Sequence, residues 1–283
     1  MEKLLITGAN GQLGVAVNQL LAGQYELVNT DVAELDITDV AAVQKLVQEV
    51  KPYAVINCAA HTAVDRCESE EAAAFRINAV GPRNLAIATA EAGAKLVHIS
   101  TDYVFDGTAG KAYTEFDAPS PASVYGASKL AGEYFVKDFA RHYFILRTAW
   151  LYGEGKNFVK TMLRLAEEKD SVAVVDDQIG SPTSAEELAR AIAWLLPTDN
   201  YGLYHATCDG ECSWADFATE IFRLAGKQTK VQRISTAEYP TPARRPAYSV
   251  LRNYMLELCG GYRFADWQQA LKEYYCTQLR CEQ

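Results

Sequence analysis

No apolar run in the sequence is long enough to cross a lipid bilayer, although 49% of the 283 residues are hydrophobic. The first three residues lead directly into a short apolar stretch, so we expect no secretory signal and a cytoplasmic location. Positive charge is scarce, with 27 Lys and Arg residues against 36 Asp and Glu residues. A nucleic-acid surface needs clustered cations, so we expect neither a nucleic-acid nor a membrane partner, and an anionic substrate needs a local basic site.

The cysteines show no spacing that is typical of a disulfide framework or a metal site. The seven cysteines are scattered and odd in number, and none forms a C-x-x-C pair. We therefore expect reduced cytosolic thiols and no metal site. A chain of this length suits one large α/β domain, or a core domain with a smaller lobe.

Three glycines near the start of the chain are spaced as in a phosphate-binding loop. Residues 4–7 have the pattern of a short buried strand, and residues 15–21 have helical spacing. Gly8, Gly11 and Gly14 lie between them, where the backbone can approach a pyrophosphate and the helix N-terminus offers free N–H groups. A strand, a glycine turn and a helix in this order predict a dinucleotide site.

An acidic residue follows the next strand pattern. Residues 25–29 lead to Asp31, and a carboxylate at this point of a βαβ unit usually accepts hydrogen bonds from the adenosine ribose. The alternative is a carboxylate that only starts a turn. Asp31 would repel the 2′-phosphate of NADPH, and residues 32–34 bring no cation. We therefore expect NADH or dual use, with a basic residue from a distant loop as the alternative that stays open.

Two further segments match the path of a dinucleotide. Asp36-Ile37 lies where a side chain can cover an adenine. A buried-strand pattern then ends in small residues before Ala60-His61-Thr62, where a dinucleotide can lie across the strand tip. The neighbours of His61 suit cofactor and substrate packing better than a catalytic base.

Tyr125 and Lys129 open a long helix-favouring stretch, four residues apart, so that their side chains share one face. An ammonium near a phenol favours the phenolate, and together with a cationic cofactor it can lower the tyrosine pKa towards neutrality. Taken alone, such a pair is also ordinary helix surface. Thr101 follows the strand pattern 95–100, at the sheet edge where ligands bind, so we expect its hydroxyl to face a reacting carbonyl.

The second half of the chain has the patterns of shorter helices and strands. They span residues 157–168, 172–176, 184–196, 201–206, 213–225 and 265–275. Arg244-Arg245 lies between prolines, and one guanidinium there suits a nucleotide diphosphate; loop solvation is the alternative. Trp150, at the end of a buried strand pattern, is either core or a platform for a sugar.

Four motifs in this order resemble the extended short-chain dehydrogenase/reductase superfamily: Gly8-x-x-Gly11-x-x-Gly14, Asn57-Cys58-Ala59-Ala60, Ser100-Thr101-Asp102 and Tyr125-Gly126-Ala127-Ser128-Lys129. Within it, residues 60–65, 101–107, 147–152, 177–183 and 239–246 look like the dTDP-4-dehydrorhamnose reductase family. The resemblance covers essentially the whole chain. It implies an α/β fold, with a Rossmann-type doubly wound parallel sheet in residues 1–150. A smaller substrate-binding lobe is implied in residues 151–283, with segments that return to the core.

The resemblance also implies an activity, the NAD(P)H-dependent reduction of the 4-keto group of dTDP-4-dehydro-L-rhamnose to dTDP-L-rhamnose. In that reaction Tyr125 protonates the C4 oxygen, Lys129 holds the nicotinamide ribose, and Thr101 hydrogen-bonds the same oxygen. Cofactor contacts are implied at Gly11, Gln12, Leu13, Asp31, Asp36, Ile37, Ala60, His61, Thr62, Tyr125 and Lys129. Substrate contacts are implied at Thr101, Asp102 and Trp150.

Other readings stay open at this point. One is another nucleotide-sugar reductase or epimerase of the superfamily, and a second is a non-catalytic cofactor-binding subunit like the one that serves methionine adenosyltransferase. Retention of Thr101, Tyr125 and Lys129 argues against the second. Some family members pair subunits through carboxylates around Mg²⁺, one of them a glutamate where this chain has Ala16. We therefore expect a monomer or a metal-free homodimer, and no catalytic role for Mg²⁺.

Overall fold

A six-stranded parallel sheet forms the centre of the protein in the computed structural model, which describes residues 1–279. Its strands are β1 (Lys3–Thr7), β2 (Glu26–Thr30), β3 (Ala54–Asn57), β4 (Lys95–Thr101), β5 (His142–Thr148) and β10 (Gly202–His205). Their order across the sheet is β10-β5-β4-β3-β1-β2, and every neighbouring pair is parallel. All four residues of β3 are buried, as expected of a strand covered on both faces. The predicted doubly wound sheet is confirmed.

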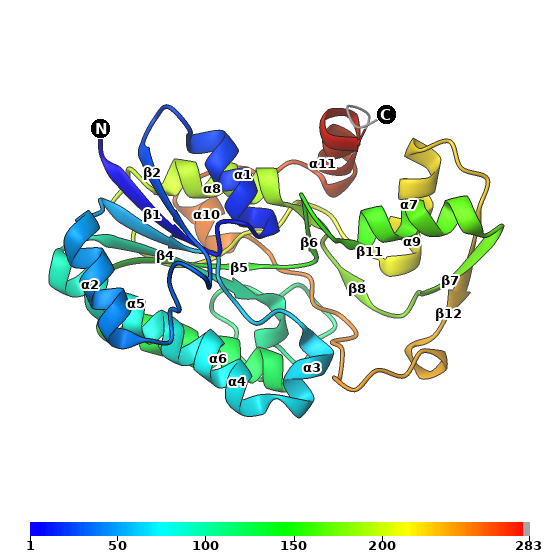
Figure 1. Cartoon of the computed structure of the whole chain (residues 1–283). Coiled ribbons are helices and arrows are strands. Elements are labelled where there is room, and N and C mark those ends of the chain that lie inside the picture. Colours follow the sequence, from blue (N-terminus) through cyan, green and yellow to red (C-terminus); the bar gives the residue numbers. More distant parts are fainter. Residues whose placement is uncertain (280–283) are drawn as a thin grey trace.

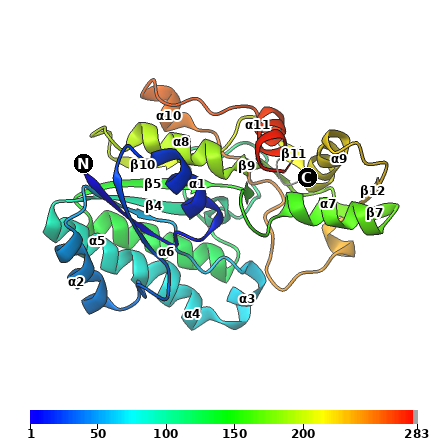
Figure 2. The same cartoon turned by 45° about the horizontal axis from the view of Figure 1, so that its top comes forward.

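Helices cover both faces of this sheet (Figures 1 and 2). One layer consists of α2 (Val40–Val50), α5 (Gly81–Ala92) and α6 (Val124–Phe139), which pack side by side. On the other face, α1 (Gln12–Leu21) packs against α8 (Ala185–Leu195). None of the helices in residues 1–279 is long and apolar enough to cross a membrane.

Beside the first helical layer, the chain between β3 and α5 is almost continuously helical. It forms α3 (Val64–Ser69), α4 (Glu71–Phe75) and one π-helical turn, η1 (Arg76–Val80), which runs directly into α5. The sequence predicted helices on both sides of this turn but did not predict the turn itself. A π-helical turn inserts an extra residue into the helical repeat and often occurs at functional sites.

A smaller lobe lies beyond the carboxyl ends of the strands, on the right in Figure 1. It contains α7 (Phe158–Glu168), α9 (Trp214–Leu224) and the parallel pair of β7 (Ser171–Val175) with β12 (Lys230–Ile234). The short strands β6 (Leu151–Tyr152), β8 (Ile179–Gly180), β9 (Thr183–Ser184) and β11 (Cys212–Ser213) connect it to the core. The sequence predicted α7, β7 and α9 but not β12.

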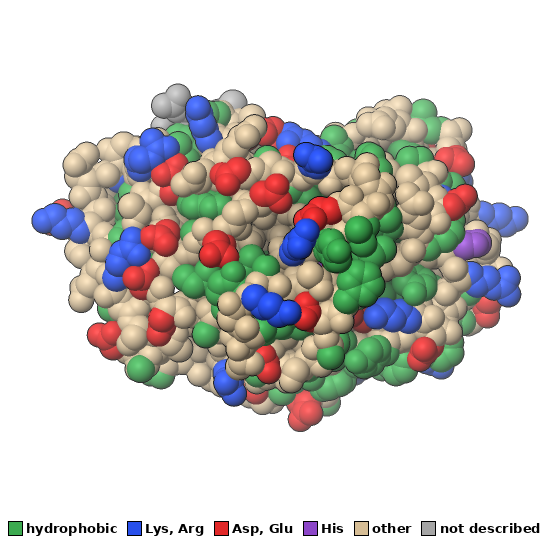
Figure 3. Space-filling model, turned by 180° about the vertical axis from the view of Figure 1, so that it is seen from behind, with side chains coloured by type: hydrophobic (Ala, Val, Ile, Leu, Met, Phe, Trp, Pro, Cys, Tyr) green, Lys and Arg blue, Asp and Glu red, His purple; other side chains and the backbone are tan. Residues whose placement is uncertain are grey.

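Parts of the second half of the chain return to the core, while the last α-helix packs beside the lobe. α8 and β10 follow the first half of the lobe, α10 (Tyr254–Leu258) contacts β10, and α11 (Trp267–Tyr274) contacts β9 and α9. Seen from behind, the surface has Lys and Arg side chains interspersed with Asp and Glu, without one large basic patch on that face (Figure 3).

A fully buried ion pair joins the helical layer to the sheet. Arg147 of β5 donates from Nε and Nη2 to the two carboxylate oxygens of Glu133 in α6, over 2.8 and 2.7 Å. Ser100 of β4, which lies opposite Arg147 in the ladder, donates to the same carboxylate over 2.6 Å. The side chains of Glu133 and Arg147 are 0% and 1% exposed. α6 is therefore fastened to two strands at their carboxyl ends.

Removing one partner of this pair should destabilise the protein strongly, because the other charge stays buried without compensation. We expect Glu133→Gln and Arg147→Met each to lower the free energy of unfolding by about 3 to 5 kcal/mol. The double variant Glu133→Leu/Arg147→Met should lose clearly less than the sum of the two. Urea unfolding followed by circular dichroism measures all three. Single variants as stable as the wild type, or additive losses, would contradict this account.

Candidate functional site

One cavity of about 890 Å³ lies at the carboxyl ends of the strands and between the core and the lobe. It passes the ends of the neighbouring strands β1 and β3. The strand order reverses between these two strands, and doubly wound sheets bind ligands at such a point. The sequence-predicted residues that line it are Gly8, Gly11, Gln12, Leu13, Gly14, Asp31, Asp36, Ile37, Ala60, Thr62, Thr101, Asp102, Tyr125, Lys129, Trp150 and Arg245. His61 and Arg244 are the predicted site residues that are absent from its lining.

Two glycines of the loop that lines the cavity, Gly8 and Gly14, have no room for a larger side chain. Gly8 has φ +65°, and a Cβ there would lie 2.7 Å from the backbone nitrogen of Ala59 after β3. A Cβ on Gly14 would lie 2.4 Å from the carbonyl oxygen of Gly8. Gly11 is the N-cap of α1 and has no side chain, so it offers no side-chain acceptor to the first N–H groups of α1, which lack a helical acceptor. These features fit the pyrophosphate of a dinucleotide.

At the end of β2, Asp31 is tied to the glycine loop. Its Oδ2 accepts from the backbone nitrogen of Asn10 over 3.2 Å, and its Oδ1 accepts from that of Val32 over 2.8 Å. Asp36 and Arg76 also line this part of the cavity. Hydrogen bonds from Thr38 lower the pKa of Asp36, and the positive charge of Arg76 adds to that shift. A cation from the distant turn η1 therefore acts on Asp36 and lines the same cavity as Asp31.

The catalytic candidates Tyr125 and Lys129 lie one turn apart at the start of α6. Ser123 caps the helix by accepting from the backbone nitrogen of Gly126 over 3.1 Å. A Cβ on Gly126 would lie 2.1 Å from the carbonyl oxygen of Tyr103, so the start of α6 is in close contact with the chain just after β4. This contact places Tyr125 next to the end of the strand that carries Thr101.

Burial controls the protonation of both side chains. It raises the pKa of Tyr125, and the negative charge of Asp102 adds to the rise, so the phenol keeps its proton at neutral pH. Burial lowers the pKa of Lys129 to about 8, against the opposing charge of Glu133. The Lys129 ammonium donates to the carbonyl oxygen of Ile99 over 2.5 Å. Lys129 is not among the main causes of the shift in the Tyr125 pKa, so the lowering that we expected from it stays a prediction for the cofactor-bound protein.

Thr101 and Asp102 form a hydrogen-bonded pair beside Tyr125. The Thr101 hydroxyl donates to Asp102 Oδ1 over 2.9 Å and accepts from the backbone nitrogen of Tyr103 over 3.2 Å. Asp102 is 2% exposed, and burial raises its pKa to about 6. Its Oδ2 is buried without a hydrogen bond of good geometry within residues 1–279, and the nearby Ser249 hydroxyl opposes the rise in pKa.

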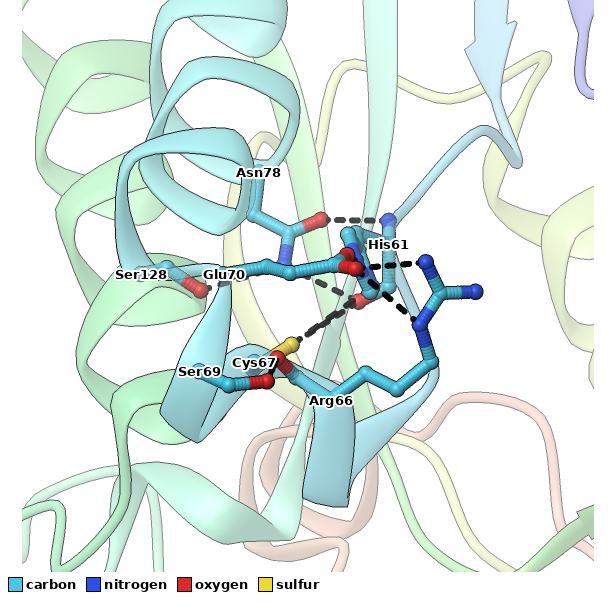
Figure 4. Close-up of polar contacts among 7 residues, drawn as sticks. All are labelled: His61, Arg66, Cys67, Ser69, Glu70, Asn78 and Ser128. Carbon is cyan, nitrogen blue, oxygen red and sulfur yellow. Dashed lines mark hydrogen bonds and ion pairs between the residues drawn. The ribbon is translucent and has the colours of Figure 1, made fainter.

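His61 supports the site through its backbone, and its imidazole ring is held outside the cavity. The ring Nε2 lies 3.1 Å from Glu70 Oε2, and the ring Nδ1 lies 3.5 Å from Cys67 Sγ (Figure 4). The Asn78 side chain accepts from the backbone nitrogen of His61 over 2.8 Å and donates to its carbonyl oxygen over 3.1 Å. The same amide donates to Ser128 Oγ over 3.0 Å.

Asn78 therefore connects the loop after β3 to the catalytic helix. It belongs to η1 and is fully buried, and Ser128, its partner, lies between Tyr125 and Lys129. Ser128 in turn donates to the carbonyl oxygen of Tyr125 over 2.8 Å. Sequence reasoning missed Asn78 because nothing local distinguishes it from any other asparagine in a helical stretch.

Two of the substrate candidates, Trp150 and Arg245, line the same cavity. Arg245 donates from Nη2 to Asp65 over 2.8 Å and from Nη1 to the hydroxyl of Tyr103 over 3.0 Å. Arg244 is exposed. Trp214 of the lobe, which sequence reasoning missed, also lines the cavity.

Metal ligands do not gather in the part of the chain that the structure describes. Within residues 1–279, no three His, Cys, Asp or Glu side chains are grouped so that they could hold an ion. Ala16, at the position of the family's bridging glutamate, is buried in α1. This position therefore offers no carboxylate to a metal ion.

Comparisons with known proteins agree with this geometry. A family model described as the RmlD substrate binding domain matches residues 1–280. A dTDP-4-dehydrorhamnose reductase from Aggregatibacter actinomycetemcomitans is 42% identical, covering 96% of this chain and 98% of its own. A crystal structure of a dTDP-4-dehydrorhamnose reductase from Clostridium acetobutylicum superposes with TM-score 0.96 at 56% identity, covering 97% of this chain and 98% of its own.

A second crystal structure is that of the Bacillus anthracis reductase of the same name, in complex with NADP. It has TM-score 0.96 and 46% identity, and the match covers 97% of this chain and 99% of the other. All of these matches extend over nearly the full length of both chains. The chain therefore belongs to the dTDP-4-dehydrorhamnose reductase family of nicotinamide-dependent oxidoreductases.

Proposed function

We propose that this protein uses NADH or NADPH to reduce the 4-keto group of dTDP-4-dehydro-L-rhamnose, giving dTDP-L-rhamnose in the last step of its synthesis. The observation that carries the proposal is that Thr101, Tyr125 and Lys129 line one cavity together with the glycine loop. The names of the relatives support this choice of substrate. The absence of a metal-bridging carboxylate at Ala16 supports a monomer or a metal-free homodimer.

In this mechanism the protein supplies a proton and fixes the reacting groups. The reduced nicotinamide, when bound, supplies a hydride to C4 of the keto sugar. Tyr125, which burial keeps protonated, donates its phenolic proton to the C4 oxygen, so the carbonyl becomes a hydroxyl group. The Thr101 hydroxyl, which donates to Asp102 Oδ1 in the unliganded protein, turns to donate to the same oxygen. With its pKa at about 8, Lys129 is largely an ammonium at neutral pH, holds the nicotinamide ribose and stabilises the phenolate that remains.

Other residues of the cavity suit the sugar nucleotide. Arg245 uses two N–H donors for Asp65 and Tyr103, and a guanidinium has five, so it can still hydrogen-bond a diphosphate oxygen. The Oδ2 atom of Asp102 can accept from a sugar hydroxyl. Trp150 offers an apolar surface to the hexose.

The direct test is turnover. The purified chain is mixed with NADH or NADPH and with dTDP-4-dehydro-L-rhamnose generated in the same vessel, and the nicotinamide absorbance is followed. A fall in absorbance together with formation of dTDP-L-rhamnose supports the proposal. Turnover only with another nucleotide sugar would identify a different reductase of the superfamily. Cofactor binding without any turnover would indicate a regulatory subunit.

Tyr125→Phe should lower kcat by about 10²-fold or more, because it removes the proton donor and keeps the ring. The Kd for the cofactor should change little. Tyr134→Phe is the matched control, since Tyr134 lies on the same helix and is 50% exposed. Steady-state kinetics and cofactor titration measure these effects. Near wild-type turnover in Tyr125→Phe would show that another group is the acid.

Asp31 and Arg76 should set the cofactor preference in opposite directions. Asp31→Asn removes a charge that repels a 2′-phosphate and keeps an acceptor for the backbone nitrogen of Asn10. The ratio of kcat/KM for NADPH to that for NADH should rise about tenfold for each 1.4 kcal/mol of repulsion relieved. Arg76→Ala should lower this ratio. A strong NADPH preference that neither variant changes would show that neither side chain reaches the ribose.

Arg245→Ala should raise KM for the sugar nucleotide by about tenfold or more, because a charge-assisted hydrogen bond to a phosphate is lost. The Kd for the cofactor should stay nearly unchanged, since Arg245 bonds to Asp65 and Tyr103 and neither belongs to the glycine loop. Arg244→Ala should have an effect below about twofold because this side chain is exposed and outside the cavity lining. If Arg245→Ala changes KM for the sugar nucleotide and Kd for the cofactor no more than Arg244→Ala does, or weakens both ligands equally, Arg245 has a purely structural role.

A further inference from the structure

Trp150 has a backbone conformation that needs support. Its φ is +48°, and it is one of two residues other than glycine with positive φ in residues 1–279. A bulky side chain in this left-handed region is strained, and such residues occur mainly where function requires them. Gly180 of β8 packs closely on the indole, because a Cβ there would lie 2.5 Å from Cε2 of Trp150.

The second support of Trp150 is Trp214. The two indole rings are stacked with centroids 3.6 Å apart and planes 7° from parallel. No third ring fits between planes at this separation, so a ligand can meet the pair only from outside. Both indoles are half-buried and both line the cavity.

Trp214 is itself held rigidly by the lobe. It is the first residue of α9, directly after Ser213, which forms a capping box with Asp216. The Ser213 hydroxyl also lies 2.6 Å from Asp176 Oδ1. The ring of Phe158, from α7, packs on Trp214 with centroids 4.7 Å apart. Two helices of the lobe thus fix this indole, and the indole fixes Trp150.

We infer that Trp214 is a further substrate-positioning residue, which holds the Trp150 indole against the cavity and completes an aromatic wall for the hexose of the sugar nucleotide. This inference rests on the proposed function for the identity of that ligand. Pyranose rings present apolar C–H faces, and aromatic side chains in pockets provide the matching flat apolar surface. Core and lobe each contribute one indole, so the wall forms only when the lobe is in place.

Binding of a stable dTDP-hexose, dTDP-glucose, tests the inference without turnover. Trp214→Ala should raise its Kd about three- to tenfold, in line with the loss of an aromatic contact, and leave the Kd for NADH or NADPH unchanged. Trp214→Phe, which keeps a ring, should recover most of the affinity. Trp194→Ala is the control, because it removes an indole of α8 that packs on Gly261 and does not line the cavity.

Two further readouts separate positioning from general stability. Stacked indoles give an exciton signal in the far-UV circular dichroism spectrum, which Trp214→Phe should abolish and Trp194→Ala should keep. In turnover, Trp214→Ala should raise KM for the sugar nucleotide more than it lowers kcat. Equal weakening of both ligands, or Kd values within about twofold of the control, would overturn the inference. If the variants change the Kd for dTDP-glucose as expected but the wild-type protein does not reduce dTDP-4-dehydro-L-rhamnose, only the proposed function is overturned.

Discussion

The site depends on the buried ion pair between Glu133 and Arg147. Glu133 lies one turn after Lys129 on α6, while Arg147 and its ladder partner Ser100 lie at the ends of β5 and β4. Two hydrogen bonds between the charges fix the rotation and the height of α6 over the sheet. A catalytic phenol on a helix and a hydroxyl on a strand can act on one oxygen atom only if these elements keep their relative position. The ion pair supplies this rigidity one helical turn from Lys129.

The cavity is assembled from parts of the chain with different tasks. The first half provides the dinucleotide end through the glycine loop and the strand tips, together with Thr101, Tyr125 and Lys129. Arg245 and Trp214 reach the cavity from the second half. The division into a core of residues 1–150 and a substrate-binding lobe with segments that return to the core stays a prediction, and β10 and α8 are segments of that kind.

Sequence reasoning succeeded where the signal is local. The glycine spacing, the strand ends and the four-residue separation of Tyr125 and Lys129 each follow from short-range backbone geometry. Arg76 and Trp214 were missed because they reach the cavity from an unpredicted π-helical turn and from a separate lobe. The direction of the His61 ring depends on Glu70 and Cys67, which a pattern of neighbouring residues does not reveal. In all three cases, contacts between distant segments determine where the side chain of Arg76, Trp214 or His61 lies.

The position of β10 determines the order in which this protein can fold during synthesis. β10 pairs with β5, and most of the residues between them form the first half of the lobe and α8. Until β10 has left the ribosome, β5 is an unpaired edge in a parallel sheet, which is a slow-forming arrangement. The nascent chain thus contains the whole glycine loop and the catalytic helix before the last strand of the sheet has been added. A chaperone that covers this edge would act on the chain at that stage.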